Sequence, residues 1–155
     1  MANQERLTYR SEIPYQSGRI GAAAVYCSDG RLGEHFDDFL HNVLCMPRYD
    51  RLALPGGAAC LAGYFAAYRE EDAAVAQLEF LVSVHGLKRV VLIAHQDCAF
   101  YTHRLEVSPL GLAERQYQDL ETALRRVREI GPALQVEAWF ASRRDGSVAF
   151  EHVGA

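Results

Sequence analysis

The sequence predicts an α/β fold in which an open, mostly parallel β-sheet is flanked by helices and carries an antiparallel strand at one edge. Short runs that are apolar on both faces, as buried parallel strands are, alternate with longer amphipathic segments. A hairpin-type turn at Arg144-Asp145-Gly146 then separates the last two predicted strands. Together these patterns indicate a parallel sheet that ends in one antiparallel pair.

The predicted elements follow from hydrophobic periodicity and from turn residues. We expect strands over residues 20–26, 49–54, 90–94, 134–141 and 147–152. Helices are predicted over 34–44, 58–86 and 109–130, and the charged cluster 69–72 predicts a break or exposed turn in the second helix. The whole chain, residues 1–155, is predicted to form a single domain in which residues 1–19 are an N-terminal extension.

Composition argues against two classes of partner. The net charge of −4 provides no basic surface for nucleic acid. No run reaches the roughly 18 apolar residues of a membrane span, and the first twenty residues contain no signal-peptide core. We therefore expect a cytoplasmic protein without nucleic-acid or membrane partners. Its four cysteines then point to metal binding, catalysis or burial before disulfides.

Two clusters of chemically useful side chains follow predicted parallel strands. Cys27-Ser28-Asp29-Gly30-Arg31 comes after the first strand, and His95-Gln96-Asp97-Cys98 comes after the third. Functional residues gather beyond the carboxyl ends of such strands. Cys27, His95 and Cys98 offer two thiolates and one imidazole, a set that suits Zn²⁺ and leaves a fourth position open for water. Zinc can lower the pKa of that water towards about 7, so that a nucleophilic hydroxide forms near neutral pH.

Asp29 and Arg31 are the candidate catalytic residues. From its position two residues after Cys27, the Asp29 carboxylate can either coordinate zinc or accept a hydrogen bond from zinc-bound water. Arg31 is its natural partner, because a bidentate pair would orient the carboxylate and keep it ionised. The sequence leaves open whether Asp29 or water fills the fourth zinc position.

These motifs resemble the β-class carbonic anhydrases. Cys-x-Asp-x-Arg and His-x-x-Cys match that family's metal motifs, and residues 77–98 resemble its helix, turn, strand and zinc-ligand segment. Val136-Glu-Ala-Trp-Phe140 with Asp145-Gly146 resembles its closing strand and hairpin, so the resemblance spans roughly residues 20–153. It implies Cys27, His95 and Cys98 as ligands and Asp29 with Arg31 as a gating pair.

The sequence departs from the family pattern near the predicted site. Residues 53–57, Ala-Leu-Pro-Gly-Gly, stand where the family commonly has Arg-Asn-Ala-Gly, and Ala99 replaces a glycine. Pro55-Gly56-Gly57 is interpreted either as backbone close to the metal pocket or as an ordinary turn. Many family members carry a Gln shortly before the first strand that helps to hold substrate, and the resemblance makes Gln16 its candidate equivalent. His103, eight residues beyond His95, is a candidate proton shuttle. The remaining cysteines are interpreted as small buried hydrophobic residues: Cys45 and Cys60.

Three functions remain open at this stage. The first is a zinc lyase in which zinc-bound hydroxide attacks carbon dioxide to give bicarbonate. The second is a zinc hydrolase that acts on a related small electrophile, carbonyl sulfide or carbon disulfide. The third is a non-catalytic zinc-binding protein on the same scaffold. The resemblance also implies a homodimer or a multiple of dimers, and the apolar residues on more than one face of 58–86 agree with it.

Overall fold

A five-stranded sheet forms the centre of the molecule in the computed structural model, which describes residues 8–154. Its strand order is β2-β1-β3-β4-β5. The first four strands are parallel and β5 runs antiparallel to β4, so the predicted fold class is confirmed. The strand bounds are β1 Ala22–Cys27, β2 Asp50–Leu54, β3 Arg89–His95, β4 Gln135–Arg144 and β5 Ser147–Val153.

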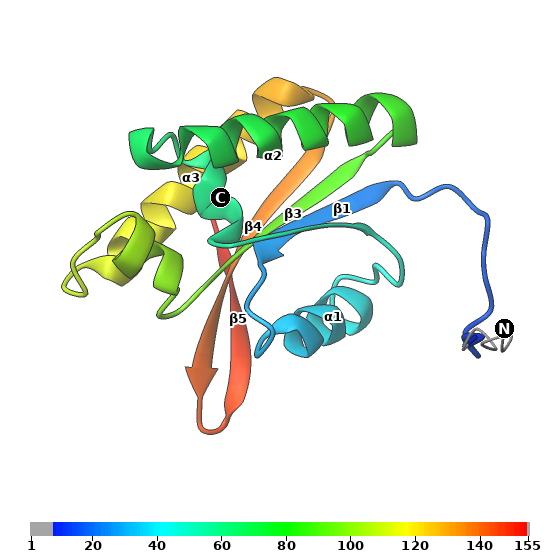
Figure 1. Cartoon of the computed structure of the whole chain (residues 1–155), viewed down its shortest axis with the longest axis horizontal. Helices are drawn as coiled ribbons and strands as arrows, with labels where there is room; N and C mark the ends of the chain where they lie inside the picture. The colour runs from blue at the N-terminus through cyan, green and yellow to red at the C-terminus, as the bar shows by residue number, and fades with distance from the viewer. Residues whose placement is uncertain (1–7, 155) are drawn as a thin grey trace, which may run out of the picture.

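Helices cover both faces of the sheet (Figure 1). Helix α1, Gly33–Asn42, lies on one face, and α2, Tyr68–Phe80, with α3, Leu112–Ile130, lies on the other. The alternation of side chains along a strand separates the two cores. Val25 of β1 belongs to the core beneath α2 and α3, whereas Tyr26 packs with Phe36 and Phe39 of α1. By the same alternation, the Cys27 side chain points to the face opposite that of Tyr26, as the sequence predicts.

The predicted N-terminal extension lies partly outside the described residues, which begin at residue 8. Residues 8–19 contain no helix or strand and run away from the sheet (Figure 1). The carbonyl of Gln16 accepts a hydrogen bond from Arg48 Nη1 at 3.1 Å, just before β2 begins. Gln16 therefore lies near the amino end of β2 in this chain, and its interpretation as a substrate residue stays a prediction. Within residues 8–154, no helix has both the length and the hydropathy of a membrane span.

The segment predicted as one helix over 58–86 is divided. Two short 3₁₀ turns, Gly57–Leu61 and Phe65–Ala67, precede α2, and a π-helical turn, Leu81–His85, follows it. The interruption lies at residues 62–64, where Gly63 adopts a φ of +81°, and not at the predicted charged cluster 69–72. Residues 69–72 instead form the first turn of α2, where carboxylates are favourable, and Glu70 and Glu71 are half-buried there.

Glycines bring the segment after β2 against the end of β1. A Cβ on Gly57 would lie 2.5 Å from the Tyr26 carbonyl carbon and 2.6 Å from the Cys27 nitrogen. Gly57 also has a φ of +51°, which disfavours other residues. The Pro55-Gly56-Gly57 turn is therefore a close approach of backbone to Cys27, the first of the two interpretations of this turn.

Helix α3 supports the loop that follows β3. Gln116 is 1% exposed, and its Nε2 donates a hydrogen bond to the carbonyl oxygen of His95 at 2.8 Å. A buried carbonyl without a partner costs about 1–3 kcal/mol. The Gln116 amide on α3 therefore fixes the backbone of His95 from the face of the sheet opposite α1.

We predict that Gln116→Leu lowers the free energy of unfolding by about 1–3 kcal/mol, because it leaves the buried His95 carbonyl unpaired. Chemical denaturation measures this loss. Gln118→Leu is the matched control, since Gln118 is exposed on the same helix. Equal stability of the two variants would show that the Gln116 hydrogen bond contributes nothing net to the fold.

Candidate metal centre

The sheet brings Cys27, His95 and Cys98 together at the carboxyl ends of two neighbouring strands. Cys27 ends β1, His95 ends β3, and Cys98 follows three residues later in a tight turn. All three are buried, at 8%, 4% and 3% exposure. One ligand atom from each side chain lies within 4.8 Å of the others, so the group can hold a metal ion.

The hydrogen bonding of His95 favours a metal ligand at Nε2. Its Nδ1 lies 2.8 Å from the Gln96 carbonyl oxygen, which can only accept, so Nδ1 carries the proton. Nε2 is then an acceptor, and it is buried without a hydrogen-bond partner of normal geometry among residues 8–154. A lone pair buried next to two sulfurs has the tautomer and placement that a metal-binding imidazole needs.

The two sulfurs have a separation close to that of a tetrahedral site. Sulfurs bonded at about 2.3 Å to one tetrahedral zinc would lie about 3.8 Å apart. Cys27 Sγ and Cys98 Sγ are 4.0 Å apart. The donor set and its spacing therefore fit zinc, with only a small movement of either side chain.

The environment of Cys27 stabilises its thiolate. A hydrogen bond from the Cys98 thiol and backbone N–H groups at Gly56 and Asp29 outweigh burial and lower the pKa of Cys27 to about 4. The same thiol–thiolate hydrogen bond raises the pKa of Cys98. Burial disfavours the charged form of His95, but the Cys27 sulfur and the Gln96 carbonyl together raise its pKa. These surroundings thus favour a thiolate at Cys27, which is the form of cysteine that binds a metal.

Asp29 and Arg31 form the ion pair that the sequence predicts. Arg31 donates to Asp29 through its backbone nitrogen at 3.0 Å, through Nε at 3.0 Å and through Nη2 at 2.6 Å. These hydrogen bonds lower the pKa of Asp29 to about 2. The Arg31 side chain is 82% exposed and that of Asp29 is 19% exposed. Arg31 thus holds an ionised carboxylate from the solvent side.

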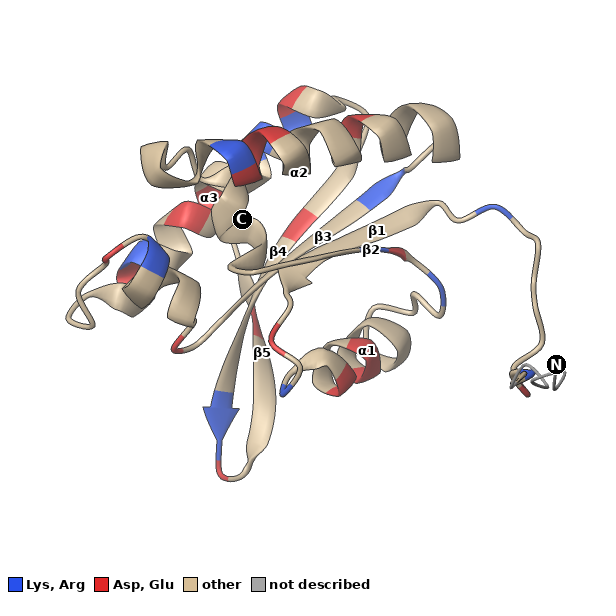
Figure 2. Ribbon diagram, in the orientation of Figure 1, with Lys and Arg blue, Asp and Glu red and all other residues tan. Residues whose placement is uncertain are grey.

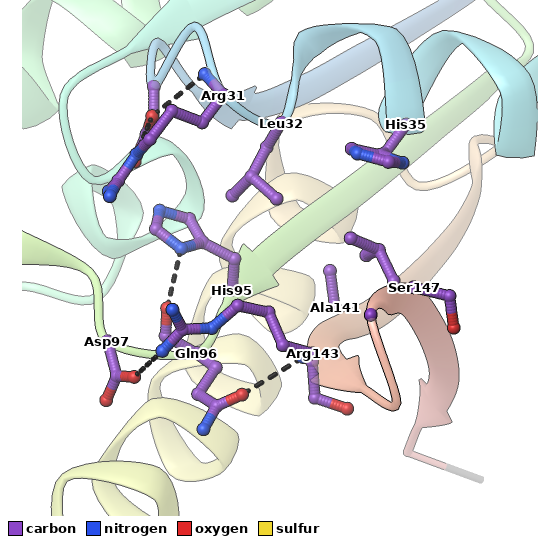
Figure 3. A pocket seen from close by; sticks show the side chains of 13 residues that line it. Arg31, Leu32, His35, His95, Gln96, Asp97, Ala141, Arg143 and Ser147 are labelled. Carbon is purple, nitrogen blue, oxygen red and sulfur yellow. Dashed lines mark hydrogen bonds and ion pairs between the residues drawn. The ribbon is translucent and has the colours of Figure 1, made fainter.

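A cavity of about 530 Å³ opens beside this pair and His95 (Figure 3). Leu32 and His35 form its wall on the α1 side, and the β4–β5 hairpin forms the opposite wall. His95, Gln96 and Asp97 lie between them at the end of β3. A small substrate can therefore reach the residues around the candidate metal centre from the α1 face of the sheet.

A buried polar network lies behind the metal group, and the sequence analysis missed it. Asp119 of α3 is 3% exposed. It accepts hydrogen bonds from Tyr64 Oη at 2.6 Å and pairs with Arg115 Nε at 3.2 Å. Tyr101, which packs with Cys27 and Cys98, also lies against Asp119. The available signal was that Gln116 and Asp119 interrupt the apolar stripe of α3 at helical spacing.

Three other candidate residues lie elsewhere. Cys45 is exposed, so the prediction of its burial is wrong, whereas Cys60 is buried as predicted. Burial raises the pKa of Cys60 to about 12, which keeps it a neutral thiol. His103 is exposed and does not line the cavity beside His95, so its interpretation as a proton shuttle is not supported. His35 lines that cavity instead.

The comparisons with known proteins agree with this geometry. A family model described as "Putative carbonic anhydrase" matches residues 18–152. The structure is similar to the β-carbonic anhydrase isoform I of Trichomonas vaginalis, with 16% identity and a TM-score of 0.55 over 97% of this chain and 90% of that chain. It is also similar to a tetrameric β-carbonic anhydrase of Sordaria macrospora, with 16% identity and a TM-score of 0.54 over 88% of this chain and 82% of that chain.

A search of curated proteins found no match. The two solved structures establish a shared fold, and the family model establishes kinship over most of the sequence. This chain is a divergent member of the β-carbonic anhydrase-like family.

Proposed function

We propose that this protein is a zinc-dependent lyase that reversibly hydrates carbon dioxide to bicarbonate. The observation that carries the proposal is the buried Cys27–His95–Cys98 group, with its orphaned His95 Nε2 and its two sulfurs 4.0 Å apart. Zinc held by these three residues would supply the Lewis acidity that makes water nucleophilic near neutral pH. The single zinc domain would span the whole chain, with residues 1–19 as its extension.

Asp29 and Arg31 are the proposed catalytic residues. In the reaction, the oxygen of water forms a bond to the carbon of carbon dioxide and one proton leaves. The Asp29 carboxylate is ionised across the neutral range and lines the cavity, so it can accept a hydrogen bond from the reacting water. Arg31 fixes the direction of that carboxylate through three donors. Orientation of this kind lowers the barrier by holding the water in one position.

The turn after β2 favours a second candidate, a hydrolase of carbonyl sulfide or carbon disulfide. Residues 53–57 carry no charged or amide side chain, and the Phe100 ring lies directly against Gly56, beside Cys27. Apolar surroundings on that side would suit the larger and more polarisable sulfur atom of these two gases.

A zinc-binding protein without catalytic activity is the third candidate. The thiols that the centre needs would stay reduced in the cytoplasm, which is the proposed location.

We predict about one zinc per chain in the freshly purified protein, with measurable hydration of carbon dioxide. Cys98→Ser should lose most of the zinc, because it removes one of two thiolate ligands. Elemental analysis and a stopped-flow assay of carbon dioxide hydration measure the two properties. The same assay with carbonyl sulfide and carbon disulfide separates the lyase from the hydrolase.

Cys60→Ser and Cys45→Ser are the control variants, and both should keep the zinc. Zinc retained in full by Cys98→Ser would exclude the proposed ligand set. Zinc at one per chain without turnover of any of the three gases would leave the non-catalytic zinc protein as the function.

We further predict that Arg31→Ala lowers activity about tenfold or more while zinc is retained. The pKa of Asp29 rises in this variant toward its ordinary value, which still leaves the carboxylate ionised at neutral pH. The loss therefore comes from misorientation, or from Asp29 turning toward the metal group, and should be the same at pH 6.5 and pH 8.5. Arg125→Ala, an exposed arginine of α3, should keep full activity. Full activity of Arg31→Ala would make the pair purely structural.

A homodimer, or a multiple of dimers, belongs to the same proposal. Large apolar side chains on and around α2 are exposed, at 92% for Phe65, 57% for Tyr68, 52% for Phe80 and 53% for Val84. Such a surface is unfavourable in water unless a partner covers it.

We predict that sedimentation at micromolar concentration gives at least twice the chain mass of 17.3 kDa. A monomer that binds zinc would show that the centre needs no second chain.

A further inference from the structure

The cavity beside His95 is much larger than carbon dioxide requires. Its volume is about 530 Å³. Cavities of roughly 300–1,000 Å³ enclose organic ligands of many atoms, whereas one water occupies only about 30 Å³ of the liquid. A three-atom gas would leave most of this space empty, so the cavity has room for an organic molecule.

The walls of the cavity combine an apolar surface with hydrogen-bonding groups. Leu32, Ala141 and Val148 supply the apolar part and come from three different segments of the chain. Polar residues line it at the end of β3, Gln96 and Asp97, and on the hairpin, Ser147. This mixture of a hydrocarbon surface and a few polar groups is typical of sites for small organic ligands.

Arg143 gives the cavity a cationic group that can change partners. Its Nη2 contacts Asp97 Oδ2 at 2.6 Å, and the two side chains are 67% and 61% exposed. An ion pair this exposed contributes little net stability, so a ligand anion can replace the aspartate at low cost. Arg31 differs, because its backbone nitrogen, Nε and Nη2 all bind Asp29. Figure 2 shows the cationic end of β4 projecting at the hairpin.

The hairpin that carries Arg143 is fixed to the loop after β3. The Gln96 backbone nitrogen donates to the Ala141 carbonyl at 2.8 Å, and Gln96 Oε1 accepts from the Arg143 backbone nitrogen at 3.0 Å. Asp145 and Gly146 both have positive φ, at 50° and 78°, as a tight two-residue hairpin turn requires. The cavity wall is therefore formed before any ligand binds, which lowers the entropy lost on binding.

We propose that this cavity binds a small organic carboxylate. The hydrocarbon body lies against Leu32, Ala141 and Val148, and the carboxylate pairs with the Arg143 guanidinium in place of Asp97. The groups proposed to contact the ligand are not metal ligands, although His95 lines the same cavity, and the proposal holds whether or not the protein hydrates carbon dioxide. A ligand bound there lies beside Asp29 and His95, so it also narrows access to the candidate metal centre.

The test compares benzoate and formate as probes of the full-length, zinc-loaded protein. Both anions can pair with an arginine or a metal, but only benzoate has a hydrocarbon body that can pack against the apolar wall. Nuclear magnetic resonance titration of the ¹⁵N-labelled protein should show benzoate binding more tightly than formate, with shifts in the hairpin and at residues 95–97. Arg143→Gln should weaken benzoate at least about tenfold, because a charge-assisted pair is lost.

Two further variants keep this test decisive. Val148→Phe narrows the cavity and should weaken benzoate while formate is unchanged, and Arg125→Gln should match the parent for both anions. Benzoate no tighter than formate, or equal benzoate affinity in the parent and Arg143→Gln, would overturn the proposal. Zinc content and carbon dioxide hydration are measured on the same samples, so failure of the carboxylate site and failure of the lyase are distinguished.

Discussion

The adjacency of β1 and β3 in a parallel sheet is the constraint on which the candidate centre depends. Their pairing runs from Ala22–Arg89 to Val25–Leu92, so the two strands end nearly level. Cys27 lies two residues beyond Val25, and His95 lies three beyond Leu92. Residues 68 positions apart in the chain therefore meet without any bend of their own strands. Because the paired residues Val25 and Leu92 face the same side, Cys27 and His95 leave their strands on opposite faces and meet across the end of the sheet.

Electrostatics explains why hydrogen-bond donors surround the Cys27 sulfur. A lone charge moved into a buried site costs several kcal/mol, so the thiolate of Cys27 needs donors nearby. The backbone N–H groups at Gly56 and Asp29 supply them, and only glycine allows the turn after β2 to come this close. The loss of the family's polar residues at 53–57 therefore leaves this backbone role intact. What it changes is the chemistry of the side chains around the substrate.

The sequence was sufficient to predict the fold class, the strand positions and the group Cys27, His95 and Cys98, because these follow from local periodicity and from the rule that sites form at strand ends. It was insufficient where tertiary contacts decide. The break at Gly63 depends on backbone conformation, not on the charge of the neighbouring residues. The place of Arg143 on the cavity wall depends on which elements pack together, and no local pattern reports that. For Asp119, helical spacing indicates the buried face of α3, but its partner Tyr64 lies 55 residues away in the chain.

The two ion pairs on the cavity look alike but differ in what they can do. Asp29 is held by three donors of one arginine and is mostly buried, so its position is fixed and its charge is constant. Asp97 holds Arg143 through a single side-chain contact in solvent, and its own φ of 54° already places it in a strained conformation. The first pair keeps the Asp29 carboxylate in one orientation beside the metal group. The second leaves a cation free to exchange its partner, because the backbone of the hairpin is fixed by Gln96 and not by that ion pair. One wall of the cavity can therefore adapt to a ligand while the carboxylate beside the metal group stays in place.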